Sequence, residues 1–374
     1  MIFNIQAIKD ICSKISVAVD DSADALEFTA NNETLTVCVS GGEYCVQCMT
    51  KMEGVSSFKA TVKASTFLKL ISMITTDTIN LSVEDNALVI KGNGTYNIPI
   101  EYKGSTMLTL PRIEINNPTF EGEVQTATLQ SLLKYNFKEM KKGVSTRPAH
   151  RLYYVNANEA ITYNSGACVN TFDETLPFED KAFLLNPKVV SLFRIIDSKS
   201  VDLKVGFDTR EDGTVAPKIS IDGGDIIISA YTFNDNNVLS SVPVNAINSR
   251  ANKAYPYCAV INKENFVQAL NRILIFATEN TSSGKFVFSE SGVEIVDITG
   301  RGFETVKVDM GMGFSDGETY VAVLNLNDLK TTLETCYDET FNIKFGDHQA
   351  VTISRTETNV INIVPEILIN MQGR

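Results

Sequence analysis

Three short groups of residues have side chains that could do chemistry. Cys45 and Cys48 form a Cys-x-x-Cys pair, which could be half of a zinc site or a redox couple. Residues 222–225, Asp-Gly-Gly-Asp, carry two carboxylates that could bind a cation. Residues 283–285, Ser-Gly-Lys, are similar to the end of a phosphate-binding loop. Each of these groups also has a purely structural explanation.

None of the groups converges with a second set of reactive residues. The cysteine pair lies in an alternating segment that predicts a strand, where residues three apart point to opposite faces, and no second pair supplies further ligands. Asp-Gly-Gly-Asp is typical of a hairpin turn, and Ser-Gly-Lys lacks the upstream glycine of a phosphate loop. The chain has two histidines, His150 and His348, and no tryptophan, so a His-based triad or a His-rich metal centre is not expected. We therefore predict a protein that is not an enzyme and that uses no metal and no cofactor.

The cysteines and the apolar pattern bear on the compartment. Seven cysteines, an odd number, are scattered along 374 residues. The first residues lack a basic segment followed by an unbroken apolar stretch, so no secretory signal is expected. No apolar run reaches the ~18 residues of a membrane span. We expect reduced thiols, a cytoplasmic location and no association with a membrane.

The most informative feature of the chain is an internal repeat. Three segments share a pattern of an apolar-striped helix, a polar break and two alternating strands, and their helices begin near residues 65, 187 and 327. Each of these three segments is preceded by another unit of one helix followed by strands. These preceding helices are expected at residues 5–17, 127–142 and 262–277. The repeat predicts an α+β fold of three similar domains, each with two helices packed on antiparallel sheets.

Polar, proline-bearing stretches at residues 110–118 and 241–253 separate the repeats. The predicted domains are residues 1–118, 119–245 and 246–374. Three such domains in series leave one open sheet edge at each end of the chain, expected near residues 96–100 and near residues 275–276. Head-to-tail pairing of these ends would generate a closed ring or an open filament.

The charge pattern decides whether nucleic acid is a candidate partner. A net charge of −12 argues against a protein coated with positive charge. All but the last of the six predicted helices are nevertheless net positive, and the rest of the chain is acidic. Either lysine simply favours helix surfaces, or the helices line a concave face that attracts phosphate without reading sequence. The basic stretch 138–151 likewise predicts either a solvated loop leading into a strand or a DNA-contacting loop with aromatic residues after it.

The order and spacing of these elements resemble the beta clamp of bacterial DNA polymerase III, a family with three domains per chain. Local similarities occur at residues 58–64, 147–156, 269–274 and 285–295. The family's usual Thr-Asp-Gly-His-Arg-Leu run is replaced by Tyr-Asn-Ser-Gly-Ala-Cys at residues 163–168. This departure is typical of a divergent clamp, such as one encoded by a phage.

The resemblance implies a DNA sliding clamp, a processivity factor that encircles duplex DNA and tethers a replicative DNA polymerase. The implied partners are duplex DNA without sequence preference, the polymerase, a clamp loader and a second copy of the chain in a head-to-tail homodimer. Two other functions remain open at this point: a structural ring or scaffold that does not bind DNA, and a clamp mimic that binds replication partners without encircling DNA.

Two sets of site residues follow from these considerations. The residues expected to contact DNA are basic side chains of the predicted helices and of the basic stretch, with the aromatic residues that follow it: Lys9, Lys14, Lys69, Lys134, Lys138, Lys141, Lys142, Arg147, Arg151, Tyr153, Tyr154, Lys188, Arg194, Lys199 and Arg272. The resemblance also places a hydrophobic groove for partner peptides between the second and third domains. By position, that groove would be lined by Val155, Tyr163, Cys168, Pro243, Val351, Val364 and Pro365.

Overall fold

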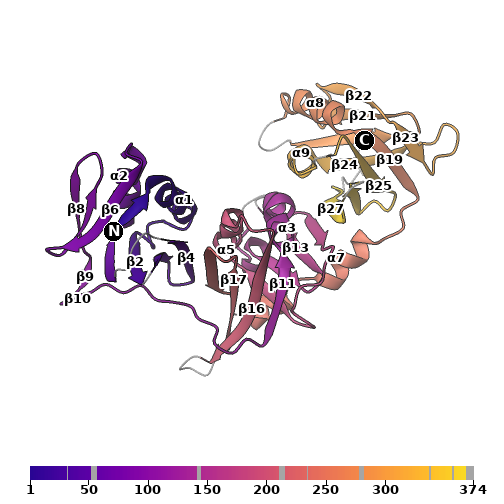
Figure 1. Cartoon of the computed structure of the whole chain (residues 1–374). Helices are drawn as coiled ribbons and strands as arrows, with labels where there is room; N and C mark the ends of the chain where they lie inside the picture. Colours follow the sequence, from indigo (N-terminus) through magenta and orange to yellow (C-terminus); the bar gives the residue numbers. More distant parts are fainter. Residues whose placement is uncertain are drawn as a thin grey trace. The chain divides into compact units, whose positions relative to one another are not determined.

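The structure is a computed structural model that describes residues 1–31, 33–51, 57–140, 145–209, 215–233, 235–277, 282–336, 338–355 and 358–367. The order of helices and strands repeats three times along the described residues (Figure 1). Each repeat begins with a strand and a first helix, continues with further strands and a second helix, and ends with three strands. We call these the first, middle and third repeats, at residues 2–99, 120–231 and 257–365.

The first repeat consists of β1 (Ile2–Asn4), α1 (Ile5–Ser16), β2 (Ala25–Asn31), β3 (Thr34–Ser40), β4 (Tyr44–Lys51), β5 (Phe58–Lys63), α2 (Ala64–Met73), β6 (Thr78–Glu84), β7 (Ala87–Lys91) and β8 (Thr95–Pro99). The short strands β9 (Tyr102–Lys103) and β10 (Thr106–Met107) follow it.

The middle repeat consists of β11 (Phe120–Gln125), α3 (Thr126–Ser131), the π-helix η1 (Leu132–Asn136), α4 (Phe137–Met140), the 3-10 helix η2 (Pro148–Arg151), β12 (Tyr153–Asn156), β13 (Glu159–Tyr163), β14 (Ala167–Thr171), β15 (Ala182–Leu185), α5 (Pro187–Leu192), the 3-10 helix η3 (Phe193–Ile195), β16 (Ser200–Thr209), β17 (Val215–Asp222) and β18 (Ile226–Tyr231).

Helices α6 (Asn236–Ser240) and α7 (Val244–Ala251) lead to the third repeat. That repeat consists of β19 (Tyr257–Asn262), α8 (Lys263–Leu274), β20 (Ser283–Phe288), β21 (Gly292–Asp297), β22 (Phe303–Lys307), β23 (Met310–Met312), β24 (Tyr320–Asn325), α9 (Leu326–Leu333), β25 (Thr340–Phe345), β26 (Ala350–Ser354) and β27 (Val360–Pro365).

Asparagine residues mark the starts of four helices. The side chains of Asn4, Asn186, Asn262 and Asn325 accept hydrogen bonds from backbone N–H groups in the first turns of α1, α5, α8 and α9. An N-cap of this kind satisfies donors that have no partner within the helix, and replacing it with alanine typically costs about 1 kcal/mol. The recurring cap is therefore a local reason why the helix starts recur at equivalent places.

Two long antiparallel sheets join strands of neighbouring repeats. The eight-stranded sheet has the order β11-β16-β17-β18-β4-β3-β2-β5, and the nine-stranded sheet has the order β15-β12-β13-β14-β27-β26-β25-β19-β23. We call the pairing of β4 with β18 the first seam and the pairing of β14 with β27 the second seam. Ile228 lies opposite Val46 in the first, and Ala167 lies opposite Ile363 in the second.

Two four-stranded sheets end in strands that have one neighbour among the described residues. Their orders are β1-β6-β7-β8 and β22-β21-β20-β24, so that β8 and β22 are edge strands. Both edges have the same burial pattern, with a buried residue, Ile98 or Val306, at the fourth position. An edge strand presents unpaired N–H and C=O groups, which another strand could pair with.

The chain forms two compact units, and these do not coincide with the repeats. The first unit comprises Met1–Gln130, Leu176–Glu179 and Asn186–Asn234, and the second comprises Ser131–Thr175, Asp180–Leu185 and Asp235–Arg374. The middle repeat thus contributes to both units, since each unit is held together by one of the long sheets. The division into domains at residues 118 and 245 stays a prediction.

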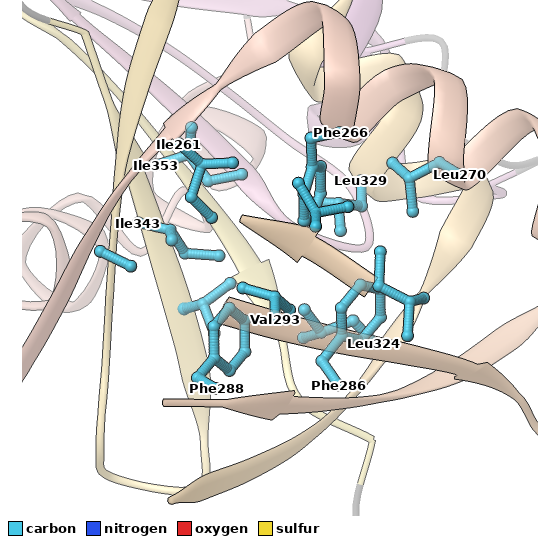
Figure 2. Packing of buried hydrophobic residues seen from close by; sticks show 14 of the residues in the cluster. Ile261, Phe266, Leu270, Phe286, Phe288, Val293, Leu324, Leu329, Ile343 and Ile353 are labelled. Atoms are coloured by element: carbon cyan, nitrogen blue, oxygen red, sulfur yellow. The ribbon is translucent and has the colours of Figure 1, made fainter. Parts of the chain in front are cut away.

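The core of the third repeat shows how helix and strand faces meet. Helix α8 buries Phe266, Leu270 and Ile273, which are spaced by three and four residues and share one face. Phe266 points from the helix toward Phe286 of β20, and their ring centroids lie 6.2 Å apart (Figure 2). Phe288, two residues further along the same face of β20, stacks 4.3 Å from the ring of Phe345.

The first helix of the middle repeat differs from the continuous helix expected at residues 127–142. It is divided into α3, the π-helix η1 and α4, and residues 141–144 lie outside the described residues. The side-chain amide of Asn136 is fully buried and donates to the carbonyl oxygens of Ala160 and Cys168 at 3.2 and 3.3 Å. The wider π turn accommodates one extra residue, and these hydrogen bonds satisfy the buried amide that it carries.

Helix α7 lies in the stretch 241–253, which the sequence predicts only as a polar boundary. Its buried residues Ile247 and Ala251 pack against β14 and β27. At its C-terminal end, Arg250 and Lys253 form ion pairs with Asp347, the latter at 2.7 Å. Helix α7 therefore covers one face of the second seam. None of the described helices combines the length and apolar character of a membrane span.

Candidate functional site

Several basic residues predicted to contact DNA are engaged in ion pairs across the first seam. Lys14 of α1 lies 3.0 Å from Asp197 and 2.8 Å from Asp225, both in the middle repeat. Burial lowers the pKa of Lys14, but its hydrogen bonds to the two carboxylates outweigh this effect and raise the pKa above its ordinary value. Lys188 of α5 lies 2.9 Å from Asp20 and donates to the carbonyl oxygen of Val17 at 3.2 Å.

The pair of Lys188 and Asp20 includes two further polar groups. The hydroxyl of Ser22 donates to Asp20 at 2.6 Å, and the hydroxyl of Tyr44 donates to it at 3.1 Å. These hydrogen bonds, with that of Ser22 the largest effect and that of Lys188 next, hold the pKa of Asp20 well below its usual range. The ammonium of Lys188 also lies 5.5 Å from the ring of Tyr44.

Other candidate cations also have partners. Lys138 of α4 lies 2.6 Å from Glu334, just after α9, so this pair crosses the second seam. Arg272 of α8 donates to both carboxylate oxygens of Glu304 at 2.6 and 3.0 Å, and it lowers the pKa of that carboxyl. Lys9 donates to the carbonyl oxygen of Ile74 at 2.8 Å. Lys138 and Arg272 therefore contribute less net positive potential than their number suggests, because a carboxylate neutralises the charge of each locally.

The remaining basic candidates among the described residues are exposed and differ in their contacts. Lys69 on α2, Arg147 before η2, Arg194 in η3 and Lys199 before β16 are exposed, and within the described ranges no carboxylate lies within ion-pair distance of them. Arg151 donates through Nε to the carbonyl oxygen of Ser145 at 2.7 Å.

Two aromatic candidates and three lysines complete the predicted set. Lys134 is exposed and lies 5.0 Å from the ring of Tyr135, whereas Lys141 and Lys142 lie outside the described residues. The prediction for Tyr153 is corrected, because this residue is fully buried, opposite Leu185 in the pairing of β12 with β15. A ring in that position cannot stack on DNA. Its neighbour Tyr154 faces the other side of the strand and is half-buried.

Four of the seven residues predicted to line a partner groove are core residues instead. Val351 and Val364 lie opposite each other in the pairing of β26 with β27, inside the core of the third repeat. Val155 is buried on β12, and the buried thiol of Cys168 donates to the carbonyl oxygen of Tyr135 at 3.6 Å. These side chains offer no surface to a peptide. Tyr163 and Pro365 are partly exposed, and Pro243 is exposed at the start of α7.

An accessible apolar surface lies close to these positions. It consists of partly buried side chains from β12, β13, α6 and α7, which we call the apolar rim: Tyr154, Tyr163, Val238, Leu239 and Val244. Beneath them lie Ala149, Leu152, Leu184 and Val242. The ring of His150 meets Tyr163 edge-on at 4.6 Å, and burial, followed by the charge of Arg147, lowers the pKa of this histidine.

On β12, the position that the resemblance assigned to the groove lies on the core side of the strand. Tyr154 is adjacent to Val155 on β12, and the two side chains point to opposite faces of the strand. On β27 the neighbour of Val364 is Ile363, which is also buried because α7 covers its face. A shift of one residue exchanges core for surface along a whole strand. The sequence did contain a signal for the accessible surface, namely the two large aromatic residues Tyr154 and Tyr163. Their spacing places both rings on the same face of the sheet when β12 pairs with β13.

The comparisons with known proteins concern the whole chain. No known protein-family profile matches the sequence, and no curated protein matches it either. Solved structures do match: the DNA polymerase sliding clamp of Pseudomonas aeruginosa has a TM-score of 0.82 at 13% identity, over 99% of both chains. The DNA polymerase III beta subunit of Thermotoga maritima has a TM-score of 0.76 at 17% identity, over 98% of this chain and 99% of that chain.

A third similar structure is the Helicobacter pylori beta clamp, with a TM-score of 0.81 at 12% identity, over 99% of this chain and 100% of that chain. The agreement therefore extends through all three repeats, although few residues are identical. This confirms the predicted mixed helix-and-sheet architecture. The chain has the fold of the bacterial DNA polymerase sliding clamp, the beta subunit of DNA polymerase III.

Proposed function

We propose that this chain is a DNA sliding clamp, a processivity factor without catalytic activity that tethers a replicative DNA polymerase to duplex DNA in the cytoplasm. The observation that carries the proposal is the match to sliding clamps along almost the entire length of both chains, with every repeat in place. The exposed cations add support for a nucleic-acid partner, and the edge strands β8 and β22 are what closure of a ring would require.

A closed ring requires a second copy of the chain. Strands β4, β14 and β22 are each the third strand after the first helix of a repeat, and β8, β18 and β27 are each the third strand after the second helix. Strand β4 pairs with β18 and β14 pairs with β27, which leaves β22 and β8. By the same rule β22 of one copy pairs with β8 of the other, which gives a head-to-tail homodimer. We call this intermolecular pairing the third seam.

Duplex DNA would be held by weak contacts to phosphate. Exposed cations without a carboxylate partner in the described part of the chain, such as Arg147, Arg194 and Lys199, can exchange one phosphate for the next. Such contacts carry no sequence information and weaken as salt rises. A clamp that moves along DNA needs this kind of contact, since a tight or sequence-specific contact would stop it.

Charge reversal of these three residues is expected to weaken DNA binding. In the variant Arg147→Glu/Arg194→Glu/Lys199→Glu, the slope of log K against log salt should fall by about 3, at about 0.9 per lost phosphate contact. Stability should change little, because exposed charges contribute less than about 1 kcal/mol each. Fluorescence anisotropy with a duplex at several salt concentrations measures the slope.

The matched control changes the same net charge on exposed lysines that are not among the residues predicted to contact DNA, in Lys51→Glu/Lys103→Glu/Lys181→Glu. This control should retain most of the salt slope. If both variants lose it equally, general electrostatics rather than the proposed contacts accounts for binding.

Polymerase and clamp loader would dock through short peptides at the apolar rim. A peptide that buries two or three large apolar side chains would gain roughly 1.5–3 kcal/mol from each, partly offset by ordering costs. The result is an affinity near the micromolar range, which suits partners that exchange on one ring. The basic side chains of Arg147 and Arg151, exposed on the neighbouring η2 segment, would favour a peptide with acidic residues.

The decisive test of the function is topological. The protein is incubated with nicked circular plasmid and separated by gel filtration in about 0.5 M NaCl, where phosphate contacts are largely lost. We expect protein to stay with the circular plasmid and to be released when a restriction enzyme linearises it, because a ring slides off free ends. Equal retention on circular and linear DNA would indicate ordinary binding, and loss from both would argue against an encircling clamp.

A further inference from the structure

We propose that the third seam is closed by apolar packing and backbone hydrogen bonds rather than by ion pairs, so that the dimer resists salt. This inference rests on the homodimer of the proposed function. It comes from comparing the two seams within the chain with the two edges that are left open.

The seams within the chain are joined by charged side chains. In the first seam, Lys14 bridges to Asp197 and Asp225, and Lys188 bridges to Asp20. In the second seam, Lys138 pairs with Glu334 at 2.6 Å. Each of these cations lies on a helix beside the paired strands, so ion pairing across a seam is a recurring feature of this chain.

The equivalent cation at the third seam already has a partner in its own chain. Arg272 lies two residues before the end of α8, as Lys14 lies two residues before the end of α1. Arg272, however, forms a bidentate pair with Glu304 on β22 of the same repeat. A guanidinium whose charge is already neutralised by a bidentate carboxylate gains less from a further carboxylate across the seam.

The first repeat also lacks carboxylates at the positions equivalent to Asp197 and Asp225, which bind Lys14 in the first seam. Asp197 lies three residues before β16, and the residue three before β6 is Thr75. Asp225 directly precedes β18, in the turn between β17 and β18. The turn between β7 and β8, residues 92–94, is Gly-Asn-Gly and carries no carboxylate. The two carboxylates that hold Lys14 thus have neutral counterparts at the open edge.

One apolar side chain of the first repeat is exposed at a position that is buried in the other two repeats. Met73 lies five residues before β6 and is 66% exposed. The residues five before β16 and β25 are Ile195 and Thr335, which are 6% and 2% exposed. This position is buried in both repeats whose second helix lies at a seam, and it is exposed in the repeat whose seam is open.

Met73 belongs to a shallow groove on α2, and a complementary apolar pair lies on the third repeat. The groove is lined by Ser65, Thr66, Lys69, Leu70 and Met73, of which Lys69 alone is charged. At the end of α8, Ile275 and Phe276 are 77% and 44% exposed. Helix α8 packs beside β22 in the same way that α1 packs beside β4. Pairing of β22 with β8 would therefore bring Ile275 and Phe276 to the groove of the second copy.

Salt should therefore affect this dimer differently from one held by ion pairs. Sedimentation equilibrium of the full chain measures the dissociation constant of the dimer at about 0.05 and 1 M NaCl. At 1 M the electrostatic screening length is only about 3 Å, so ion pairs at the surface are weakened. We expect the constant to stay within about threefold or to fall, since apolar association is not screened. A rise of about tenfold or more would overturn the inference while leaving the dimer in place. Absence of a dimer at every salt concentration would overturn the proposed homodimer itself.

A gain-of-sensitivity variant tests the mechanism. Glu304→Gln frees Arg272, and Thr75→Asp restores a carboxylate at the position of Asp197. The double variant should form a dimer whose dissociation constant rises about tenfold between the two salt concentrations. The matched neutral control, Glu304→Gln/Thr75→Asn, should stay insensitive. If the Asp variant is as insensitive as the Asn control, Arg272 does not lie opposite Thr75, and the proposed seam is wrong.

Discussion

Replacing Met73 with aspartate is expected to convert the dimer into a monomer. Met73 lies in the groove of α2 and is 66% exposed in a single chain, so its burial depends on the second copy. The substitution removes roughly 1.5–3 kcal/mol of apolar burial and adds the cost of desolvating an unpaired carboxylate. At about 1.4 kcal/mol per tenfold, the dissociation constant should rise at least about a hundredfold. A head-to-tail dimer contains this contact twice, which increases the effect.

The matched control is Met310→Asp. Met310 lies on β23 and is 57% exposed, but that strand is at the far edge of the nine-stranded sheet and has no part in the proposed third seam. Light scattering should give the mass of one chain for Met73→Asp and of two chains for Met310→Asp at micromolar concentration. Both variants should unfold at the temperature of the wild type after correction for dimerisation. A dimer of undiminished stability in Met73→Asp would exclude α2 from the contact.

The second large effect concerns Val364, which the resemblance to clamps placed in a partner groove. Val364→Asp is expected to destabilise the third repeat by more than about 4 kcal/mol. Its side chain is 1% exposed and faces Val351 within the core, so the change loses apolar burial and places an unpaired carboxylate among hydrocarbon groups. Since whole domains are stable by only about 5–15 kcal/mol, much of the protein should unfold or aggregate.

Chemical denaturation followed by circular dichroism measures this effect. The control Ile367→Asp, two residues beyond β27 and 39% exposed, should change stability by less than about 1 kcal/mol. Tyr154→Asp, on the apolar rim, should keep the fold and weaken binding of a polymerase-derived peptide. If Val364→Asp instead folds normally and loses only peptide binding, Val364 lines an accessible groove and its placement in the core is wrong.

The sequence by itself determined the features that depend on local periodicity. The three- and four-residue spacing of Phe266, Leu270 and Ile273 identified α8 and its buried face, because a helix returns to the same side at those intervals. Alternation in segments such as β20 and β21 identified strands, and the recurrence of both patterns at domain-sized intervals indicated three similar repeats. The resemblance to clamps rested on the order and spacing of the elements along the whole chain rather than on any single motif.

The tertiary structure decided the features that depend on contacts with distant parts of the chain. Whether Tyr153 or Tyr154 faces the core is a matter of strand register, and one residue of shift exchanges the two. Whether Lys14 is available to phosphate depends on Asp197 and Asp225, which lie far along the chain and approach only when β4 pairs with β18. The covering of the second seam by α7 is equally invisible in a polar, proline-bearing stretch. Local patterns fix which residues share a face, but the neighbours that bury or neutralise them come from distant parts of the chain.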